Sequence, residues 1–374
     1  MACGFPGYNI VVGRSGPFPV GDWTGAIVPS SRTQFGPPIT RAILSLLHGE
    51  TPEDKVAPEE AETCLRRLEC GGYLRSLWNQ ERRAGSLPRG WRTALERAHR
   101  KTMLDTLAAL ADFRAFGRLI EAEGIPFILL KGGCYLLDLY DDLGQRPLTD
   151  IDLLVRPSDA PRLRRCLEGA GYATLQWDEE YRRFEMIPPG QGRCSFEVHW
   201  GLGLSERNID QDRVWERSRV AVLEDVSCRR LAPDDALLFH VAHLADHFFG
   251  PSLKWVIDLR LMFQRWQLDP ESLIKKAAEW RMRTALALSI QNLEKLFPGE
   301  APAVLRTGLP LGTLRRWLLR LFQDPESFQI MNLGDGMLAR YSARCVLVDR
   351  PFDLFKGATR IVRRSLHGGY EGVH

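Results

Sequence analysis

Apolar residues recur along this chain in two helical stretches that flank a stretch of strand-like patterns. From Pro38 to about Glu123 they are spaced three and four residues apart, as on amphipathic helices, and Gly124 provides a stop signal. After about Pro233 wide apolar stripes return and again indicate helices. We therefore expect a small central sheet with helices before and after it in the sequence.

The central stretch contains short runs with strand character. Residues 126–133, PFILLKGG, form a continuous apolar run that ends in glycines, and residues 149–155, TDIDLLV, alternate polar and apolar positions. Residues 181–187 and 193–200 predict a hairpin, with CSFEVHW as its second strand. Between these strands, residues 157–172 predict a capped amphipathic helix that glycines close.

These boundaries predict an α+β protein with four segments. Residues 1–38 are expected to be an irregular lead-in, because 13 of the first 40 residues are glycine or proline and no helical period is present. A helical N-terminal region spans 39–123, a small mixed-sheet core spans 124–232, and a helical C-terminal domain spans 233–374. We expect the two helical lobes to flank the core and to form a cleft.

Composition narrows the functional classes without naming one. The 374 residues include 50 lysines and arginines against 47 aspartates and glutamates, a formal net charge of +3. Proteins devoted to duplex nucleic acid carry a marked basic excess, so this balance argues against nucleic acid as a partner. The basic stretches 315–320 and 360–368 are interpreted as solvated helix faces, since few aromatic residues interleave with them.

The compartment is predicted from cysteine usage and from the start of the chain. Eight cysteines are scattered without a CxxC pair or zinc-ribbon spacing, which favours free thiols in a reducing environment. No apolar run approaches the roughly 18 residues of a membrane helix, and the first residues lack the basic and apolar regions of a signal peptide. We expect a cytoplasmic protein with no membrane partner.

The strongest chemical signal is a pair of acids within an apolar strand. Asp150 and Asp152 are two positions apart, so on a strand both carboxylates project from the same face. Glu197 alternates with apolar residues in the same way, and His199 shares its face. If the two strands are neighbours, three carboxylates cluster, and a divalent cation such as Mg²⁺ would offset the cost of burying them.

A glycine pair precedes the acids. Lys131, Gly132 and Gly133 stand at the end of the first predicted strand, where paired glycines allow backbone N–H groups to approach a phosphate closely. Arg146 lies just before the acidic strand and offers a forked donor for the same anion. The sequence contains neither the GxxxxGK[ST] loop nor the GxGxxG loop at this point.

In this order the motifs resemble the polymerase-beta-like nucleotidyltransferase superfamily. The segments LKGGCYLLDLY, RPLTDIDLLV and FEVHW are similar to one branch in particular, a family of uncharacterised bacterial nucleotidyltransferases, over about residues 90–270. The resemblance implies a nucleotidyltransferase core between the helical lobes. It also implies phosphate-binding glycines and metal-binding carboxylates, which correspond to Gly132, Gly133, Asp150, Asp152 and Glu197.

The resemblance further implies two-metal transfer of a nucleoside monophosphate from an NTP, with pyrophosphate released. The cofactor would be Mg²⁺ or Mn²⁺, and the acceptor a hydroxyl or phosphate on a small molecule or modified peptide, as in natural-product or peptide modification. Lys131 and Arg146 would help to position the β- and γ-phosphates. Candidate contacts to nucleotide or acceptor are His199, His243, Lys254 and Asp258.

Other interpretations of these features stay open at this stage. A DxD pair also serves metal-dependent glycosyl transfer from a nucleotide-sugar, and an NTP-binding regulator without catalysis is a third reading. His240, His243 and His247 share one helical face, but no HExxH frame accompanies them, so core or cleft histidines are favoured over a zinc site. Base preference, acceptor and oligomeric state are not encoded in any motif found.

Overall fold

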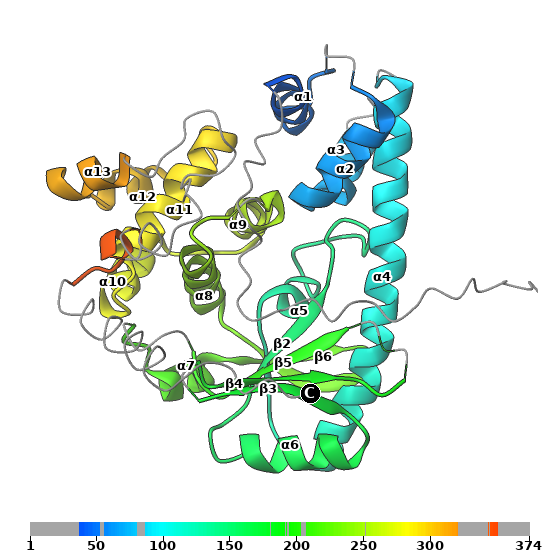
Figure 1. Cartoon of the computed structure of the whole chain (residues 1–374). Helices are drawn as coiled ribbons and strands as arrows, with labels where there is room; N and C mark the ends of the chain where they lie inside the picture. The colour runs from blue at the N-terminus through cyan, green and yellow to red at the C-terminus, as the bar shows by residue number, and fades with distance from the viewer. Residues whose placement is uncertain are drawn as a thin grey trace, which may run out of the picture. The chain divides into compact units, whose positions relative to one another are not determined.

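The computed structural model contains a seven-stranded mixed sheet, drawn in the lower part of Figure 1 with α6 below it. The chain divides into two units, Met1–Thr33 and Gln34–His374, and every described residue belongs to the second. The structure describes residues 37–350 apart from 53–55, 81–86, 180, 191, 193, 203–206, 251, 321–342 and 344. The predicted lead-in over 1–38, but for its last two residues, and the basic stretch 360–368 therefore lie outside the described residues.

The sheet combines parallel and antiparallel pairs. Its strands are β1 (Ile128–Leu129), β2 (Asp150–Leu154), β3 (Ala173–Asp178), β4 (Arg183–Ile187), β5 (Ser195–His199), β6 (Arg219–Leu223) and β7 (Val226–Arg230). The strand order is β3-β4-β5-β2-β1-β7-β6. The pairs β2·β5 and β1·β7 are parallel, and the other four are antiparallel. The predicted hairpin β4–β5 is confirmed. The two strands that carry the acids, β2 and β5, are neighbours.

Helices precede, interrupt and follow the strands. Before the sheet come α1 (Pro37–Leu47), α2 (Pro58–Leu68), α3 (Gly71–Gln80) and α4 (Arg89–Ala122). Between strands lie α5 (Lys131–Tyr135), α6 (Ala160–Gly169) and α7 (Gln211–Arg217). After the sheet follow α8 (Pro233–Asp246), α9 (Leu253–Arg265), α10 (Pro270–Glu279), α11 (Arg283–Leu296), α12 (Ala303–Gly308) and α13 (Thr313–Arg320). The α+β class predicted from the sequence is thus the observed one.

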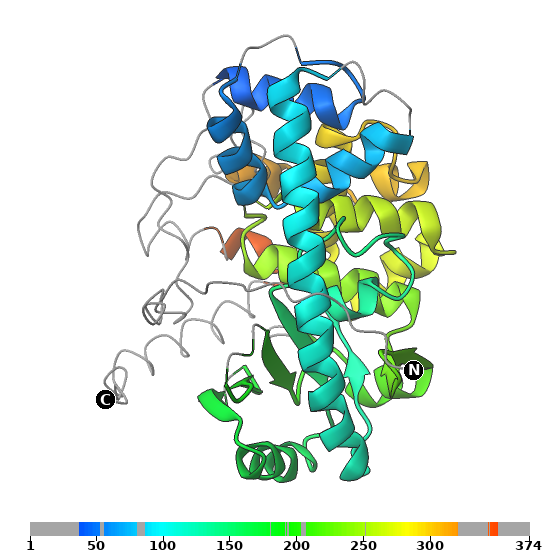
Figure 2. The same cartoon turned by 90° about the vertical axis from the view of Figure 1, so that its right-hand side faces the viewer.

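The long helix α4 joins the first helices to the sheet. In Figure 2 it runs from the helices at one end, drawn in blue, to the strands at the other. Near its C-terminal end Phe116 stacks on Phe196 of β5, with ring centroids 3.9 Å apart, and meets Tyr172 edge-on. A side chain at Gly117 would collide with Val226 of β7, so α4 and β7 pack in close contact. Helix α4 therefore covers the apolar face of the sheet.

Strand alternation leaves the opposite face of β2 and β5 polar. Ile151 and Leu153 of β2 and Phe196 and Val198 of β5 are fully buried on the α4 side. The residues between them point the other way. Helix α5 follows β1 directly and packs against both β2 and α8. The polar face is therefore the side on which the chain brings α5 and α8 to the sheet.

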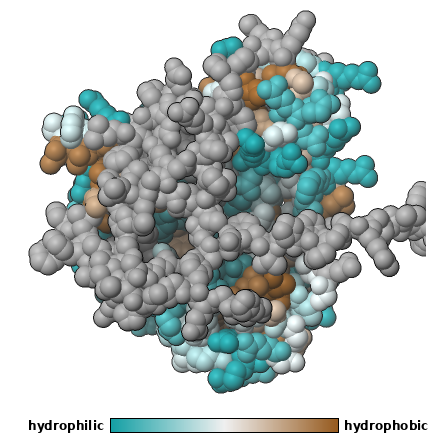
Figure 3. Space-filling view, in the orientation of Figure 1, coloured by the Kyte–Doolittle hydropathy of each residue, from teal (hydrophilic) through white to brown (hydrophobic). Residues whose placement is uncertain are grey.

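Among the described helices, none is both long and apolar enough to cross a membrane. On the face drawn in Figure 3, apolar residues that reach the surface form separate patches between hydrophilic ones. The large apolar side chains with the greatest exposure in the described part lie on β6 and α13, and they include Val220, Val222, Leu314 and Trp317.

Candidate active site

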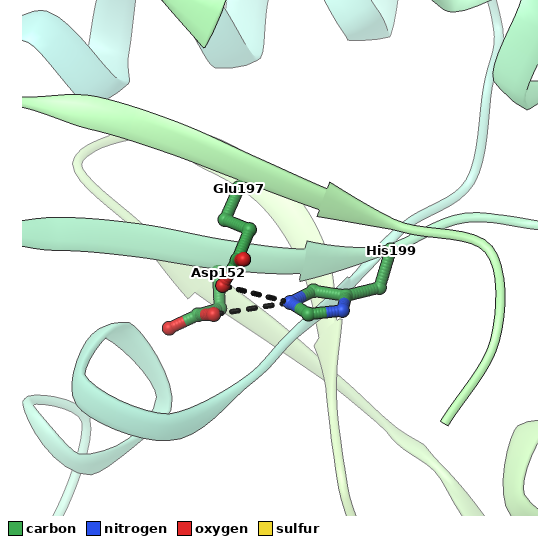
Figure 4. Close-up of side chains that lie close together, drawn as sticks. All are labelled: Asp152, Glu197 and His199. Carbon is green, nitrogen blue, oxygen red and sulfur yellow. Dashed lines mark hydrogen bonds and ion pairs between the residues drawn. The ribbon is translucent and has the colours of Figure 1, made fainter. Parts of the chain in front are cut away.

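Three polar side chains meet on the polar face, where β2 and β5 run in parallel. The register places Asp152 beside Glu197 and Leu154 beside His199. As Figure 4 shows, Asp152, Glu197 and His199 point toward one another. The Nε2 atom of His199 lies 3.1 Å from Oδ1 of Asp152 and 3.2 Å from Oε2 of Glu197. One donor atom from each side chain lies within 4.8 Å of the others, which is close enough for all three to bind one metal ion.

Lys131 completes this cluster from the first residue of α5. Its Nζ atom lies 2.6 Å from Oδ1 of Asp152 and 3.6 Å from Oε2 of Glu197. Strand β1 brings the lysine there, because the amide of Leu130 donates to the carbonyl of Asp152. The backbone of Lys131 has a φ of 40°, a left-handed conformation that costs a non-glycine residue about 1–2 kcal/mol. Glycine would avoid that cost, so the position indicates a use for the ammonium group.

A second permanent cation, Arg183, borders the carboxylates. Arg183 of β4 donates from Nη1 to Oε1 of Glu197, the oxygen that faces away from Lys131. Burial alone would raise the pKa of Glu197, but the charges of His199 and Lys131 outweigh burial and hold that pKa well below its usual range. Glu197 is therefore charged in the folded protein.

The pKa of Asp152 shifts in the opposite direction from that of Glu197. It is 2% exposed, and this burial raises its pKa in spite of the opposing charge of Lys131. Burial by itself would lower the pKa of both Lys131 and His199, but the surrounding carboxylates raise both, chiefly Asp152 for the lysine and Glu197 for the histidine. The carboxylates and cations thus neutralise one another in a network closed to water on most sides.

Asp150 stands one step along the same strand. It is half-buried, and its Oδ1 accepts a hydrogen bond of 3.0 Å from the hydroxyl of Thr149. Its charge helps to raise the pKa of Asp152 and of Lys131. The sequence predicted a cluster of three carboxylates; the structure brings two of them together with His199, and Asp150 lies beside that group.

The two glycines differ in what they permit. A Cβ atom on Gly132 would lie 2.6 Å from Nη1 of Arg146 and 2.9 Å from Cδ1 of Leu148. The nearest atom to a Cβ on Gly133 would be 3.5 Å away, an ordinary contact. A side chain at Gly132 would therefore force Arg146 and Leu148 to shift, whatever the part of the glycine in phosphate binding.

Arg146 and Asp258, both predicted to contact substrate, bind each other instead. The guanidinium donates from Nε to Oδ1 (2.8 Å) and from Nη2 to Oδ2 (2.9 Å) of Asp258, and from Nη1 to the carbonyl of Pro147. The hydroxyl of Tyr140 donates to the same carboxylate. Arg146 is 5% exposed and Asp258 is 0% exposed, so the ion pair is buried.

The three histidines of α8 have different surroundings. His240 is buried between the hydroxyl of Tyr135, 3.1 Å from Nδ1, and the carbonyl of Trp255, 2.7 Å from Nε2. His243 and His247 lie with ring centroids 4.4 Å apart, and both contact the Trp255 ring. Within the described residues, no group of three metal-binding side chains includes any of these histidines. The preference for core or cleft histidines over a zinc site agrees with this arrangement.

His243 also lies within electrostatic reach of the cluster. Burial lowers its pKa well below the usual value, and the charge of Lys131 lowers it further. Lys254, another predicted substrate contact, forms an ion pair of 2.7 Å with Glu69. Of the residues predicted on α8 and α9, His243 is thus the one without such an ionic partner among the described contacts.

Comparison with known proteins gives a family match. The model of a family described as uncharacterised nucleotidyltransferase matches residues 55–298, a range that contains every strand and the whole cluster. Among curated proteins, none matches this sequence.

Comparison with solved structures gives partial matches. The antibiotic-resistance factor ANT(2'')-Ia is 16% identical, with a TM-score of 0.36 over 49% of this chain and 95% of its own. The lincosamide antibiotic adenylyltransferase LnuA, solved with lincomycin bound, is 15% identical, with a TM-score of 0.30 over 41% of this chain and 94% of its own. An antigenic nucleotidyltransferase-like protein from Paracoccidioides brasiliensis is 15% identical, with a TM-score of 0.31 over 52% of this chain and 89% of its own.

Proposed function

The chain belongs to the family of uncharacterised nucleotidyltransferases, and from this premise we propose that it transfers a nucleoside monophosphate from an NTP to an acceptor. The acceptor would be a hydroxyl or phosphate on a small molecule or modified peptide, and pyrophosphate would leave. The observation that carries the proposal is the group of possible metal ligands formed by Asp152, Glu197 and His199. These side chains lie on two neighbouring strands, and Lys131 contacts Asp152.

The residues present fit a divalent cation. Two carboxylates and one imidazole nitrogen converge, and Mg²⁺ and Mn²⁺ bind carboxylates together with substrate phosphates. Asp152 and Glu197 would hold the first ion, and Asp150, beside them on β2, is the carboxylate left for a second. When bound, such ions supply charge stabilisation on the triphosphate and a lower pKa for the acceptor hydroxyl.

The chain's own groups would orient the nucleotide. The Lys131 ammonium and the backbone N–H groups of Gly132 and Gly133 stand next to the carboxylates, where the β- and γ-phosphates would lie. His199 holds the carboxylate oxygens of Asp152 and Glu197 in place through its two contacts.

The predicted roles of three other residues change in the light of their partners. We assign Arg146 and Asp258 to positioning, because each satisfies the other in a buried pair. Lys254 is held by Glu69 at the edge of α9. His243, with the neighbouring ring of Trp255, is retained as the candidate contact to base or acceptor.

A nucleotide-turnover assay tests the proposal. The full chain is incubated with Mg²⁺ or Mn²⁺, each NTP and a panel of hydroxyl and phosphate acceptors, and pyrophosphate release is followed. Asp152→Asn should abolish release, whereas Asp212→Asn, at a carboxylate with an 86% exposed side chain, should leave it intact.

Two outcomes would count against nucleotidyl transfer. Release of a nucleoside diphosphate from a nucleotide-sugar would favour glycosyl transfer at the same site. Absence of metal-dependent nucleotide binding would remove both enzymatic functions.

A further inference from the structure

We propose that the Lys131 ammonium holds the divalent-cation position of the acidic cluster until a cation binds, and then moves onto the nucleotide phosphates. This inference rests on the proposed function and deepens it, because it predicts how metal and nucleotide binding are coupled. It concerns Lys131 itself, not the ligand set.

The first step is that Lys131 and His199 contact the same two carboxylate oxygens. Lys131 Nζ approaches Oδ1 of Asp152 and Oε2 of Glu197. These are the same two oxygens that His199 Nε2 contacts from β5. The ammonium therefore contacts two of the three candidate ligand side chains at the oxygens that face His199.

The second step is that a divalent ion and the ammonium exclude each other there. Mg²⁺ lies about 2.1 Å from its carboxylate ligands. With Asp152 as ligand, the ion would be within about 5 Å of Lys131 Nζ at its present position, 2.6 Å from the Asp152 oxygen. Charges of +2 and +1 that share one oxygen repel strongly in a site this buried. The present position of the ammonium is therefore unfavourable once an ion is bound.

The third step is that Lys131 is the group able to leave. Lysine carries its charge on a flexible four-carbon stem, and this side chain keeps 15% exposure. Arg183 binds the opposite oxygen of Glu197, and His199 is itself one of the three candidate ligands of the ion. Neither of these two needs to move for an ion to enter.

The fourth step concerns the direction in which Lys131 moves. Its Cα atom begins α5 beside Gly132 and Gly133, the proposed phosphate-binding residues. An ammonium released from the carboxylates stays tethered at that point, where a triphosphate would accept it. A cation thus frees the lysine that the nucleotide needs, and by linkage the nucleotide strengthens cation binding by the same factor.

Lysine reactivity measures the release directly. Reductive methylation of the full chain, followed by peptide mass spectrometry, reports how accessible each ammonium is. Lys276 is a matched control: its Nζ lies 2.9 Å from Asp235, and its side chain has the same 15% exposure. Mn²⁺ alone should raise Lys131 methylation about tenfold and leave Lys276 unchanged, and Mn²⁺ with NTP should lower it again.

Metal titration supplies the second readout. Mn²⁺ binding, followed by electron paramagnetic resonance, should be about tenfold tighter in Lys131→Met than in the wild type without nucleotide. This gain should vanish when NTP is present, because the variant lacks the phosphate contact. Lys131→Arg, which keeps the charge, should not show the gain.

The outcomes separate the two proposals. If wild-type protein binds Mn²⁺ while Lys131 methylation stays constant, the inference fails and the proposed function stands. Equal Mn²⁺ affinity in wild type and Lys131→Met would also overturn the inference. If neither protein binds Mn²⁺ with or without NTP, the proposed function fails and the inference with it.

Discussion

Arg146 and Asp258 form a bidentate ion pair inside the protein although 112 positions separate them in the sequence. The pair links the segment just before β2 to helix α9, and the Tyr135 ring lies 5.3 Å from the guanidinium carbon. Thr106 of α4 reaches the carbonyl of Arg146. The strand that carries Asp152 is thereby fixed to helices that come both before and after it in the chain.

Breaking this pair should be costly for folding. Asp258→Asn would leave a buried guanidinium without its counter-charge and should reduce the free energy of unfolding by about 3–5 kcal/mol in urea denaturation. Asp141→Asn is the matched control, because Asp141 also binds an arginine, Arg265, through two oxygens but is 59% exposed. Asp141→Asn should reduce the free energy of unfolding by less than about 1 kcal/mol. Equal losses would contradict the assignment of Arg146 to positioning.

The glycine pair provides a second comparison. Gly132→Ala should destabilise the fold by about 1–3 kcal/mol, since the new methyl group would meet Arg146 and Leu148 below contact distance. Gly133→Ala has room for its methyl group and should change stability by less than about 1 kcal/mol. Urea unfolding of the two variants side by side tests this, and a larger loss at Gly133 would show that the packing argument is wrong.

Removing His199 should weaken cation binding at the cluster but not abolish it. His199→Asn takes away the nitrogen that contacts both Asp152 and Glu197 and should weaken Mn²⁺ binding about 10–100-fold. Glu197→Gln removes a carboxylate that would itself hold the ion, so its effect should be larger. Mn²⁺ affinity measured by calorimetry ranks the two; an unchanged affinity in both variants would exclude this cluster as the cation site.

Acid should destabilise the protein through His240. Burial lowers the pKa of His240 below its usual 6.5, so the unfolded chain binds a proton more readily than the folded one. Its contribution is fully present above pH 6.5 and is lost as the pH falls through the folded pKa, by at most about 1.4 kcal/mol per pH unit. His240→Gln should show a shallower decline in unfolding free energy on acidification than the wild type.

His199 gives the opposite sign and serves as the control. Its pKa is raised by Glu197 and Asp152, which outweigh burial, so its stabilisation is present below pH 6.5 and is lost as the pH rises through the folded value. The wild type should therefore lose stability as the pH rises from 6.5 through the folded pKa of His199, and His199→Gln should lose less over that range, measured without metal. A larger loss in this variant over that range would contradict the sign derived from the ion pairs.

The two strands that carry the acids, and the faces on which these acids lie, could be predicted from the sequence. Residues 149–155 and 193–200 alternate with period two, which is a local property, and so the faces of Asp152 and Glu197 were predictable before the strands were known to be neighbours. The helices on both sides were predictable for the same reason. Strands β3, β6 and β7 were not predicted: β6, for example, exposes Val220 and Val222 at the sheet edge, so its apolar pattern does not report burial.

Which charged residues pair with one another was decided only by the tertiary structure. The sequence alone assigned Lys131, Arg146 and Asp258 to substrate, because each has the right chemistry, but spacing along a chain does not tell which charges share a buried site. Burial makes an unpaired charge costly, so long-range packing selects the pairs Lys131–Asp152 and Arg146–Asp258. The sequence determined which groups the site could use, and the fold determined which of them were free to act.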